Sequence, residues 1–368
     1  MNEHILTLAR ENAPCYLYEY DIMKAQVETL RQTFPQYDLL YSIKANPFPP
    51  VVRALAALGL GADAASAPEV LLSRTCGMAK EDIFFSAAGK SDAALEAAWD
   101  EGEIIADSLG EVARIGALCR RKGQRRAIGV RMNPAFGMGG GAGTSSKFGI
   151  NEEDLPQLKA LLDDLPVTVE GIHVHLKSQN LDADVLGGCY RDSWALAKRV
   201  HAALDCEMRY VNFGSGVGVA YDAAFEQPMN LARLRTYTDA IAADNDATWK
   251  ARLMIETGRF PTAQAGTYWL RVVDKKFSRE PLFTSEWAFP IIAHGDESRA
   301  ETVDIVGNLC CAADVLTEDF TGPELAVGDL IEVRNAGAYA CTLTAQRFSS
   351  HQPPRELLVY GDGRVETE

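Results

Sequence analysis

The sequence predicts an α/β fold, a (β/α)8 barrel followed by a second, smaller, all-β domain. Short apolar, β-branched runs alternate with segments of helical period along most of the 368-residue chain. Eight such strand-then-helix units fit in roughly 240 residues, the usual size of a closed barrel. After residue 265 the helical segments stop and strand-like runs follow one another. A doubly wound open sheet is the alternative, but eight regular repeats favour closure.

The expected barrel strands are short runs that end in small or polar residues. They are "DLLYSIKA" (38–45), "GADAAS" (61–66), "DIFFSA" (82–87), "EIIADS" (103–108), "AIGVRMN" (127–133), "VEGIHVHL" (169–176), "RYVNFGS" (209–215) and "LMIETGR" (253–259). Helical patterns lie between them at 49–59, 67–78, 92–102, 111–123, 154–165 and 192–204. We therefore expect the barrel domain over residues 25–265.

The second domain is expected to hold residues 1–24 and 266–368, as a β-sandwich or a barrel-like sheet. Its strand-like runs lie at 266–278, 280–289, 301–308 and 328–339. The early run "CYLYEYD" (15–21) precedes the first barrel unit, so we expect it to pair with the later sheet. The glycine-rich segment "FGMGGGAGTSSKFG" (136–149) is typical of a flexible loop over a site.

The composition argues against several classes of protein. A net charge of −15 disfavours nucleic-acid binding, which needs a basic surface. No apolar run of eighteen or more residues occurs, and the N-terminus does not have the pattern of a secretory signal. The eight cysteines are scattered, without zinc spacing. We therefore expect a cytoplasmic protein with reduced thiols, no membrane partner and no metal site.

Polar residues gather at the expected strand ends, where barrel enzymes carry their chemistry. They are Lys44, Ser66, Asp107, Arg131, His175, Gly214 and Glu256. A lysine on the first strand, "NFGSG" after the seventh and "ETGR" after the eighth together indicate a phosphorylated aldehyde cofactor. Pyridoxal 5'-phosphate fits this pattern, because a lysine amine forms an imine with its aldehyde.

Each of these groups then has a physical role. Lys44 would be the imine-forming amine, and Glu256 would face the pyridine nitrogen and keep it protonated. The phosphate would be held by Arg259 and by the backbone N–H groups of Gly214, Ser215 and Gly216. A simple turn, a surface Glu–Arg pair and a core histidine at position 173 or 175 are the plainer alternatives. Only the convergence of separate strand ends favours the functional interpretation.

Taken in order along nearly the whole chain, these motifs resemble the fold-type III pyridoxal-phosphate decarboxylases, which have an alanine racemase-like barrel. This family includes diaminopimelate, ornithine and arginine-biosynthetic decarboxylases. The matching stretches are "YSIKANP" (41–47), "DAASAPE" (63–69), "HLKS" (175–178), "NFGSG" (212–216), "ETGR" (256–259), "GNLCCAAD" (307–314) and "GAYA" (337–340).

The resemblance implies specific site residues. Lys44 would be the Schiff-base lysine, His175 would stack on the cofactor ring, and Ser178 would contact the phosphate. Cys310 would be the acid that protonates the α-carbon after carbon dioxide leaves, acting across the interface of a homodimer. Further cofactor contacts would come from Asp63, Ser66, Gly258 and Tyr339.

Departures from the family pattern bear on the substrate. Cys311 stands where relatives carry an acid that recognises the far end of the substrate, and a neutral thiol cannot pair with a distal ammonium. A modified or conjugated amino acid of siderophore or other specialised metabolism, such as an acylated or citrate-linked one, therefore fits better than ornithine, lysine or diaminopimelate. We expect Cys311, Arg131, Lys177 and Asp314 to contact it.

Three alternatives stay open. Diaminopimelate decarboxylase of lysine biosynthesis is the second hypothesis. A racemase would need an unprotonated pyridine nitrogen, which Glu256 disfavours. A non-catalytic homologue that has kept the fold without the cofactor is disfavoured by the presence of Lys44, Arg259 and Cys310.

Overall fold

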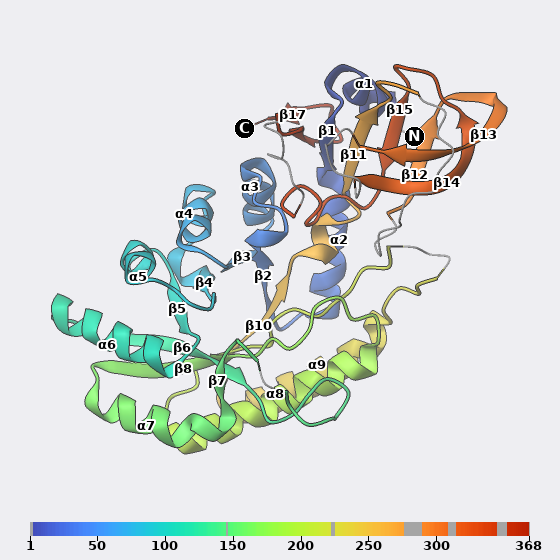
Figure 1. Ribbon diagram of the computed structural model, residues 1–368. Helices are drawn as coiled ribbons and strands as arrows, with labels where there is room; N and C mark the ends of the chain where they lie inside the picture. The colour runs from blue at the N-terminus through green and yellow to red at the C-terminus, as the bar shows by residue number, and fades with distance from the viewer. Residues whose placement is uncertain are drawn as a thin grey trace. The chain divides into compact units, whose positions relative to one another are not determined.

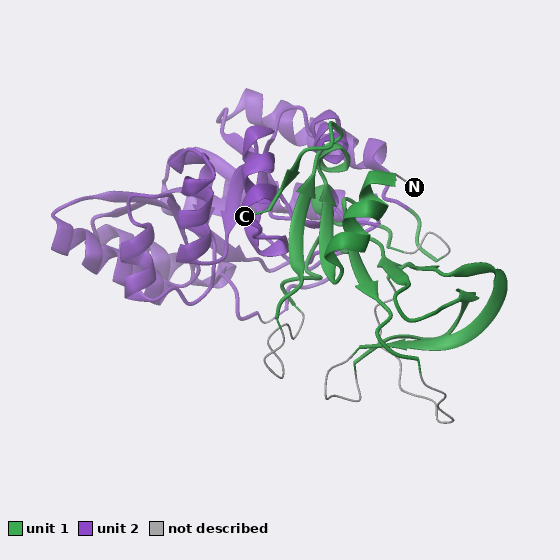
Figure 2. Cartoon of the chain, turned by 90° about the horizontal axis from the view of Figure 1, so that it is seen from above, with its two compact units in different colours: residues 1–23, 220–227, 261–368 green, residues 24–219, 228–260 purple. Residues whose placement is uncertain are grey.

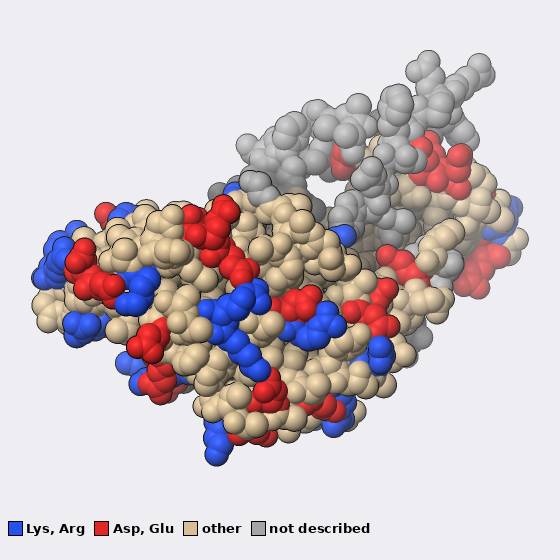
Figure 3. Space-filling model, turned by 90° about the horizontal axis from the view of Figure 1, so that it is seen from below, with Lys and Arg blue, Asp and Glu red and all other residues tan. Residues whose placement is uncertain are grey.

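The computed structural model describes residues 3–144, 146–221, 225–275, 289–307, 314–343 and 352–367. The chain divides into two compact units (Figure 2). Unit 1 contains residues 1–23, 220–227 and 261–368, and unit 2 contains residues 24–219 and 228–260. No helix in the described ranges is both long enough and apolar enough to cross a membrane. Acidic and basic side chains are interspersed on the face that Figure 3 shows.

Unit 2 contains a closed barrel of eight parallel strands, which confirms the predicted architecture. Each strand pairs with the next barrel strand, and pairing of β10 with β2 closes the ring. The strands are β2 (Asp38–Ser42), β3 (Gly61–Ala64), β4 (Ile83–Phe85), β5 (Glu103–Ala106), β6 (Arg126–Asn133), β8 (Val167–His173), β9 (Tyr210–Asn212) and β10 (Arg252–Thr257). All eight lie where the sequence predicted them. A short ninth strand, β7 (Ile150–Asn151), pairs with the end of β6.

The helices of unit 2 begin with clear sequence signals. Ser66, Ser91 and Ser108 cap α4, α5 and α6 by accepting a hydrogen bond from a backbone N–H three residues later. The six predicted helices are confirmed, and α9 is additional, as are α2 and α10, which each belong partly to unit 1 and partly to unit 2. Their bounds, which can be followed in Figure 1, are α2 (Tyr20–Thr33), α3 (Pro49–Ala57), α4 (Ala67–Thr75), α5 (Asp92–Ala98), α6 (Leu109–Lys122), α7 (Leu155–Asp164), α8 (Ala183–Leu204), α9 (Leu231–Ala247) and α10 (Arg259–Thr262).

A large tyrosine occupies part of the barrel interior. Tyr210 belongs to a buried cluster with apolar side chains of four other strands, which are Leu40, Phe84, Ile105 and Met254. The neighbouring strands make room with glycines. A Cβ on Gly129 would lie 2.1 Å from the Tyr210 hydroxyl oxygen, and one on Gly171 would lie 2.4 Å from its ring. These two glycines therefore permit a close approach that no larger residue allows.

Unit 1 is built on a six-stranded sheet with the order β12-β15-β11-β1-β16-β17. As predicted, the early strand joins this sheet, antiparallel to β11 and parallel to β16. A separate antiparallel pair is formed by β13 and β14. The strands are β1 (Cys15–Glu19), β11 (Gly266–Arg271), β12 (Ile291–His294), β13 (Asp296–Val306), β14 (Val315–Glu324), β15 (Leu330–Val333), β16 (Arg355–Val359) and β17 (Val365–Glu366).

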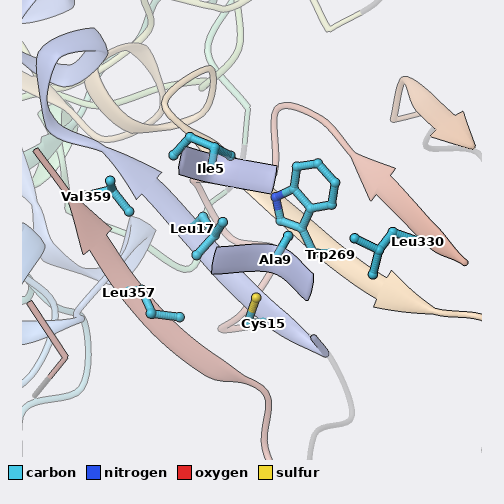
Figure 4. Packing of buried hydrophobic residues seen from close by; sticks show 8 residues of the cluster. All are labelled: Ile5, Ala9, Cys15, Leu17, Trp269, Leu330, Leu357 and Val359. Carbon is cyan, nitrogen blue, oxygen red and sulfur yellow. The ribbon is translucent and has the colours of Figure 1, made fainter. Parts of the chain in front are cut away.

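Unit 1 also contains a helix that the sequence analysis did not predict, α1 (Glu3–Asn12). Its residues Ile5 and Ala9 belong to one buried apolar cluster with Leu17 and Trp269 (Figure 4). The helix therefore buries its apolar side against the sheet. The predicted strand at 280–289 lies almost entirely outside the described residues.

Candidate active site

Lys44 lies directly after the first barrel strand, in a single helical turn that spans Ile43–Ala45. Its Nζ donates a hydrogen bond to Asp63 Oδ2 over 2.7 Å. The side chain of Lys44 is 46% exposed, whereas that of Asp63 is 0% exposed. The Nζ of Lys44 is thus held by a buried carboxylate, while almost half of the surface of its side chain is exposed.

The buried carboxylate of Asp63 is surrounded by hydrogen-bond donors. Ser42 Oγ donates to its Oδ2 over 2.8 Å, and Ser86 Oγ donates to its Oδ1 over 2.5 Å. Burial by itself opposes ionisation, but the charge and hydrogen bond of Lys44 outweigh it and hold the pKa of Asp63 well below its usual range. Asp63 therefore remains a carboxylate at neutral pH.

Glu256 lies near the end of the last barrel strand and is 3% exposed. Its Oε1 accepts a hydrogen bond from Asn212 Nδ2 over 2.9 Å and lies 3.2 Å from His173 Nε2. Burial and the charge of Asp63 raise the pKa of Glu256, whereas His173 and Lys44 lower it, and the net direction is downward. A buried acid that stays ionised has the charge needed to keep a pyridine nitrogen protonated.

His175 follows the sixth barrel strand, and both of its ring nitrogens have partners. The Ser215 backbone N–H donates to Nδ1 over 3.1 Å, and Ser178 Oγ lies 3.2 Å from Nε2. Burial lowers the pKa of His175 to about 4, so the ring is neutral at pH 7. Because Nδ1 accepts a hydrogen bond, the proton of the neutral ring is on Nε2. The Nε2–H group then donates a hydrogen bond to Ser178 Oγ.

The turn after the seventh strand depends on glycine. Gly214 has φ +67°, and a Cβ there would lie 2.5 Å from the Val174 carbonyl oxygen. Its backbone N–H donates to Asn212 Oδ1 over 2.9 Å, and the N–H of Ser215 is used by His175. The predicted use of the N–H groups of Gly214, Ser215 and Gly216 for phosphate, together with the side chains of Ser178 and Arg259, stays a prediction.

Arg131, a predicted substrate contact, is buried at the end of β6. Its Nη1 lies 3.7 Å from Asp107 Oδ1, and its guanidinium stacks on the Phe148 ring with Cζ 4.3 Å from the centroid. Phe148 belongs to the glycine-rich segment 136–149 that was expected to cover a site. The structure therefore brings this segment against Arg131.

The structure also reveals site residues that sequence reasoning missed. Lys90 is 0% exposed, and its Nζ donates to the carbonyl oxygens of Ala87 and Ile105 and to Glu111 Oε1. Burial lowers the pKa of Lys90 and raises that of Glu111. The signal available in the sequence was a second lysine just beyond a strand end, in "FFSAAGKS". Ser86, His173 and Asn212 were missed as partners of the two buried acids.

The remaining predicted site residues lie in different parts of the chain. Ser66 Oγ accepts a hydrogen bond from the Glu69 N–H over 3.3 Å and so caps α4. Gly258 and Arg259 follow β10, and Arg259 begins α10. Lys177 is exposed after β8. Asp314 and Tyr339 belong to unit 1, and Cys310 and Cys311 lie outside the described residues. The roles expected for these residues stay predictions.

Comparison with known proteins identifies the class of enzyme. The pyridoxal-binding domain of the pyridoxal-dependent decarboxylases matches residues 21–263, which is more than half of the chain. The protein belongs to this family, as the motifs predicted. It is therefore a pyridoxal-phosphate-dependent lyase that acts on an amino acid.

Individual relatives are similar over nearly the full length. An L-glutamyl-(BtrI acyl-carrier protein) decarboxylase of Niallia circulans is 30% identical over 95% of this chain and 89% of its own. A diaminopimelate decarboxylase of Methanothermobacter thermautotrophicus is 27% identical over 90% and 82%. The crystal structure of Helicobacter pylori diaminopimelate decarboxylase with L-lysine matches with a TM-score of 0.83 and 23% identity, covering 96% and 93%. This last match confirms the fold.

The residues of the barrel site fit pyridoxal phosphate. Lys44 would present a primary amine on a partly exposed side chain to the aldehyde, and Glu256 would present a buried, ionised carboxylate to the ring nitrogen. His175 is a neutral ring that is held in place through both of its nitrogens. The described residues contain no group of three or more His, Cys, Asp or Glu side chains that could hold a metal ion.

Proposed function

We propose that this protein decarboxylates a modified α-amino acid whose far end is neutral or anionic. The observation that carries the chemistry is the pair formed by Lys44, whose side chain is partly exposed, and the buried carboxylate of Asp63, with Nζ and Oδ2 2.7 Å apart. When bound, the cofactor supplies an electron sink that accepts the pair left on the α-carbon as the carboxyl group leaves as carbon dioxide.

We assign each residue of the site a separate role around the bound cofactor. Lys44 would hold the cofactor through its aldehyde, and Glu256 would keep the ring nitrogen protonated. His175 would stack on the ring, while Ser178, Arg259 and the turn of Gly214, Ser215 and Gly216 would hold the phosphate. Asp63 keeps the Lys44 amine pointed into the site. Cys310 returns a proton to the α-carbon as general acid.

The substrate class rests on the departure at Cys311 and on one relative. A thiol at this position cannot neutralise a distal ammonium group. The Niallia circulans relative is named for a glutamyl group attached to an acyl-carrier protein, which is an amino acid without a free distal amine. Both support an acylated, citryl or carrier-linked amino acid. Lys177 and Arg131 are the cations available for a distal carboxylate.

A diaminopimelate decarboxylase is the second candidate, because several relatives carry that name. Carbon dioxide release separates the two. We expect kcat/KM for acylated, citryl or carrier-linked substrates to exceed that for free meso-diaminopimelate, ornithine and lysine by at least about tenfold. Fastest turnover of free meso-diaminopimelate would assign the protein to lysine biosynthesis instead.

A variant can test the role of position 311 directly. Cys311→Asp restores an acid, so we expect it to raise kcat/KM for free diamino acids and to lower it for the conjugates. Cys311→Ser is the matched control, since it keeps a small neutral side chain, and should leave the preference unchanged. Equal behaviour of the two variants would place recognition of the distal group elsewhere.

We also infer a cytoplasmic homodimer with shared active sites, on the basis of the motif around Cys310. Lys44→Ala and Cys310→Ala variants should each be inactive, and mixing them under conditions of subunit exchange should restore part of the activity. Recovery requires that Lys44 and Cys310 of one site come from different subunits. Absence of recovery, with exchange demonstrated by a labelled subunit, would show that each site is built within one chain.

A further inference from the structure

His173 lies at the centre of a row of three buried polar side chains. It is the last residue of β8, paired in register with Arg131 on β6 and with Asn212 on β9. Paired residues of neighbouring strands point to the same side of a sheet. His173 is 2% exposed, and Arg131 and Asn212 are buried as well. The row therefore lies side by side at the C-terminal ends of the barrel strands.

The contacts of His173 are unusual for a buried imidazole. Its Nε2 lies 3.2 Å from Glu256 Oε1, close enough for an N–H···O contact although the angle is short of a regular hydrogen bond, and within the described residues neither ring nitrogen has another hydrogen-bond partner. A buried polar ring without a well-formed hydrogen bond is costly, so the short contact with Glu256 calls for a physical explanation. The same carboxylate oxygen accepts a hydrogen bond from Asn212 Nδ2.

We propose that His173 is a positioning residue for Glu256, holding Oε1 together with Asn212 so that Oε2 is left for the ring nitrogen of the cofactor. The proposal rests on the role assigned to Glu256 above. The ring that stacks on the cofactor is expected to be His175, two residues further along, so His173 acts only through the carboxylate.

Three substitutions distinguish this role from simple filling of space. His173→Phe keeps an aromatic ring of similar size and removes the donor. His173→Asn keeps a polar amide that is too short to reach Oε1. His173→Gln is the matched control, because its longer amide places an N–H where Nε2 lies. A residue that only fills space would tolerate phenylalanine at least as well as glutamine.

The direct readout is the ¹⁵N chemical shift of ring-labelled pyridoxal phosphate bound to each variant, which reports protonation of the ring nitrogen. We expect wild type and His173→Gln to show the protonated nitrogen, and His173→Phe and His173→Asn to shift towards the unprotonated form. In the latter two, kcat should fall on the order of tenfold with KM nearly unchanged. Thermal unfolding of each variant without cofactor checks that the barrel is intact.

Two results would overturn the proposal. One is an unchanged nitrogen shift and kcat in His173→Phe and His173→Asn while Glu256→Gln changes both, which would leave Glu256 independent of His173. The other is an unchanged nitrogen shift in Glu256→Gln itself, which would remove the role on which the proposal rests. Carbon dioxide release by the wild-type protein tests the decarboxylase function separately from either result.

Discussion

At the C-terminal ends of the barrel strands, the buried acids Asp63 and Glu256 have pKa values below the usual range. Glu103, the first residue of β5, and Glu170, within β8, have pKa values above it because of burial. Burial is the largest influence on all four acids. The difference lies in their partners, because the first two are surrounded by Lys44, serine hydroxyls, an amide and an imidazole.

This difference shows that the C-terminal end of the barrel stabilises ionised carboxylates in its interior. Asp63 and Glu256 stabilise the fold above the pKa that they have in the unfolded chain, and this contribution is lost as the pH falls. Glu103 and Glu170 behave in the opposite way, because their pKa is raised. Their burial is least costly at low pH, and stability is lost as the pH rises through the folded pKa. An acid kept ionised in the interior therefore marks the functional end.

The largest effect is expected at Lys44. Lys44→Ala removes the amine that holds the cofactor, so carbon dioxide release should fall below detection. It also leaves Asp63 buried without its cation. Lys159→Ala, which removes an exposed lysine paired with Asp163, is the control and should keep full activity. Full turnover by Lys44→Ala would remove Lys44 from the mechanism.

A large loss of stability is expected at Lys90, on the same end of the barrel. Lys90→Met removes the 2.6 Å partner of buried Glu111 and leaves only Arg114, 4.0 Å away, which should lower the free energy of unfolding by about 3 kcal/mol. Urea unfolding of the cofactor-loaded protein measures it. Lys159→Met breaks an exposed pair and should cost less than about 0.5 kcal/mol. Equal losses in the two variants would show that the buried pair contributes no more than a surface one.

A smaller effect is expected in the turn after β9. Gly214→Ala places a Cβ 2.5 Å from the Val174 carbonyl oxygen at φ +67°. We expect weaker cofactor binding, measured by equilibrium dialysis, and a loss of stability of roughly 1–2 kcal/mol from the left-handed backbone alone. Gly141→Ala, where a Cβ would meet nothing within 4 Å, is the control. Unchanged cofactor affinity in Gly214→Ala would separate this turn from the cofactor site.

The smallest effect is expected at the first residue of β5, and its sign is opposite. Glu103→Gln removes a charge that burial disfavours, so the free energy of unfolding at neutral pH should rise by less than about 1 kcal/mol. The gain should disappear as the pH falls below 4.5, the reference pKa of the acid, because the glutamate is then neutral too. Glu28→Gln, at an exposed position of α2, is the control and should leave the free energy of unfolding at neutral pH unchanged. A loss of stability in Glu103→Gln at neutral pH would contradict the comparison of the two ends.

The sequence was sufficient to predict the barrel and its main candidates, because strand period and strand-end residues are local signals. Lys44 and Glu256 were found in this way. Lys90 was missed because "AGKSD" has the composition of an exposed turn, and its three acceptors come from Ala87, Ile105 and Glu111. Such a contact depends on strand neighbours that are distant in sequence.

The space that a side chain fills and the direction of its hydrogen bonds also could not be predicted from local sequence patterns. The fit of Tyr210 between Gly129 and Gly171 involves three different strands. The hydrogen bond from the Ser215 N–H to His175 Nδ1 depends on the orientation of one imidazole. The helix α1 was missed because its apolar residues had no visible partner until strand β1 was placed in the late sheet.

Borohydride reduction of the cofactor-loaded protein, followed by proteolysis and mass spectrometry of the peptides, tests the central claim most directly. We predict a pyridoxyl phosphate group fixed to Lys44 and to no other lysine, with loss of the visible absorbance. Attachment at another lysine such as Lys177, or no attachment in a protein that still releases carbon dioxide, would contradict the site described here.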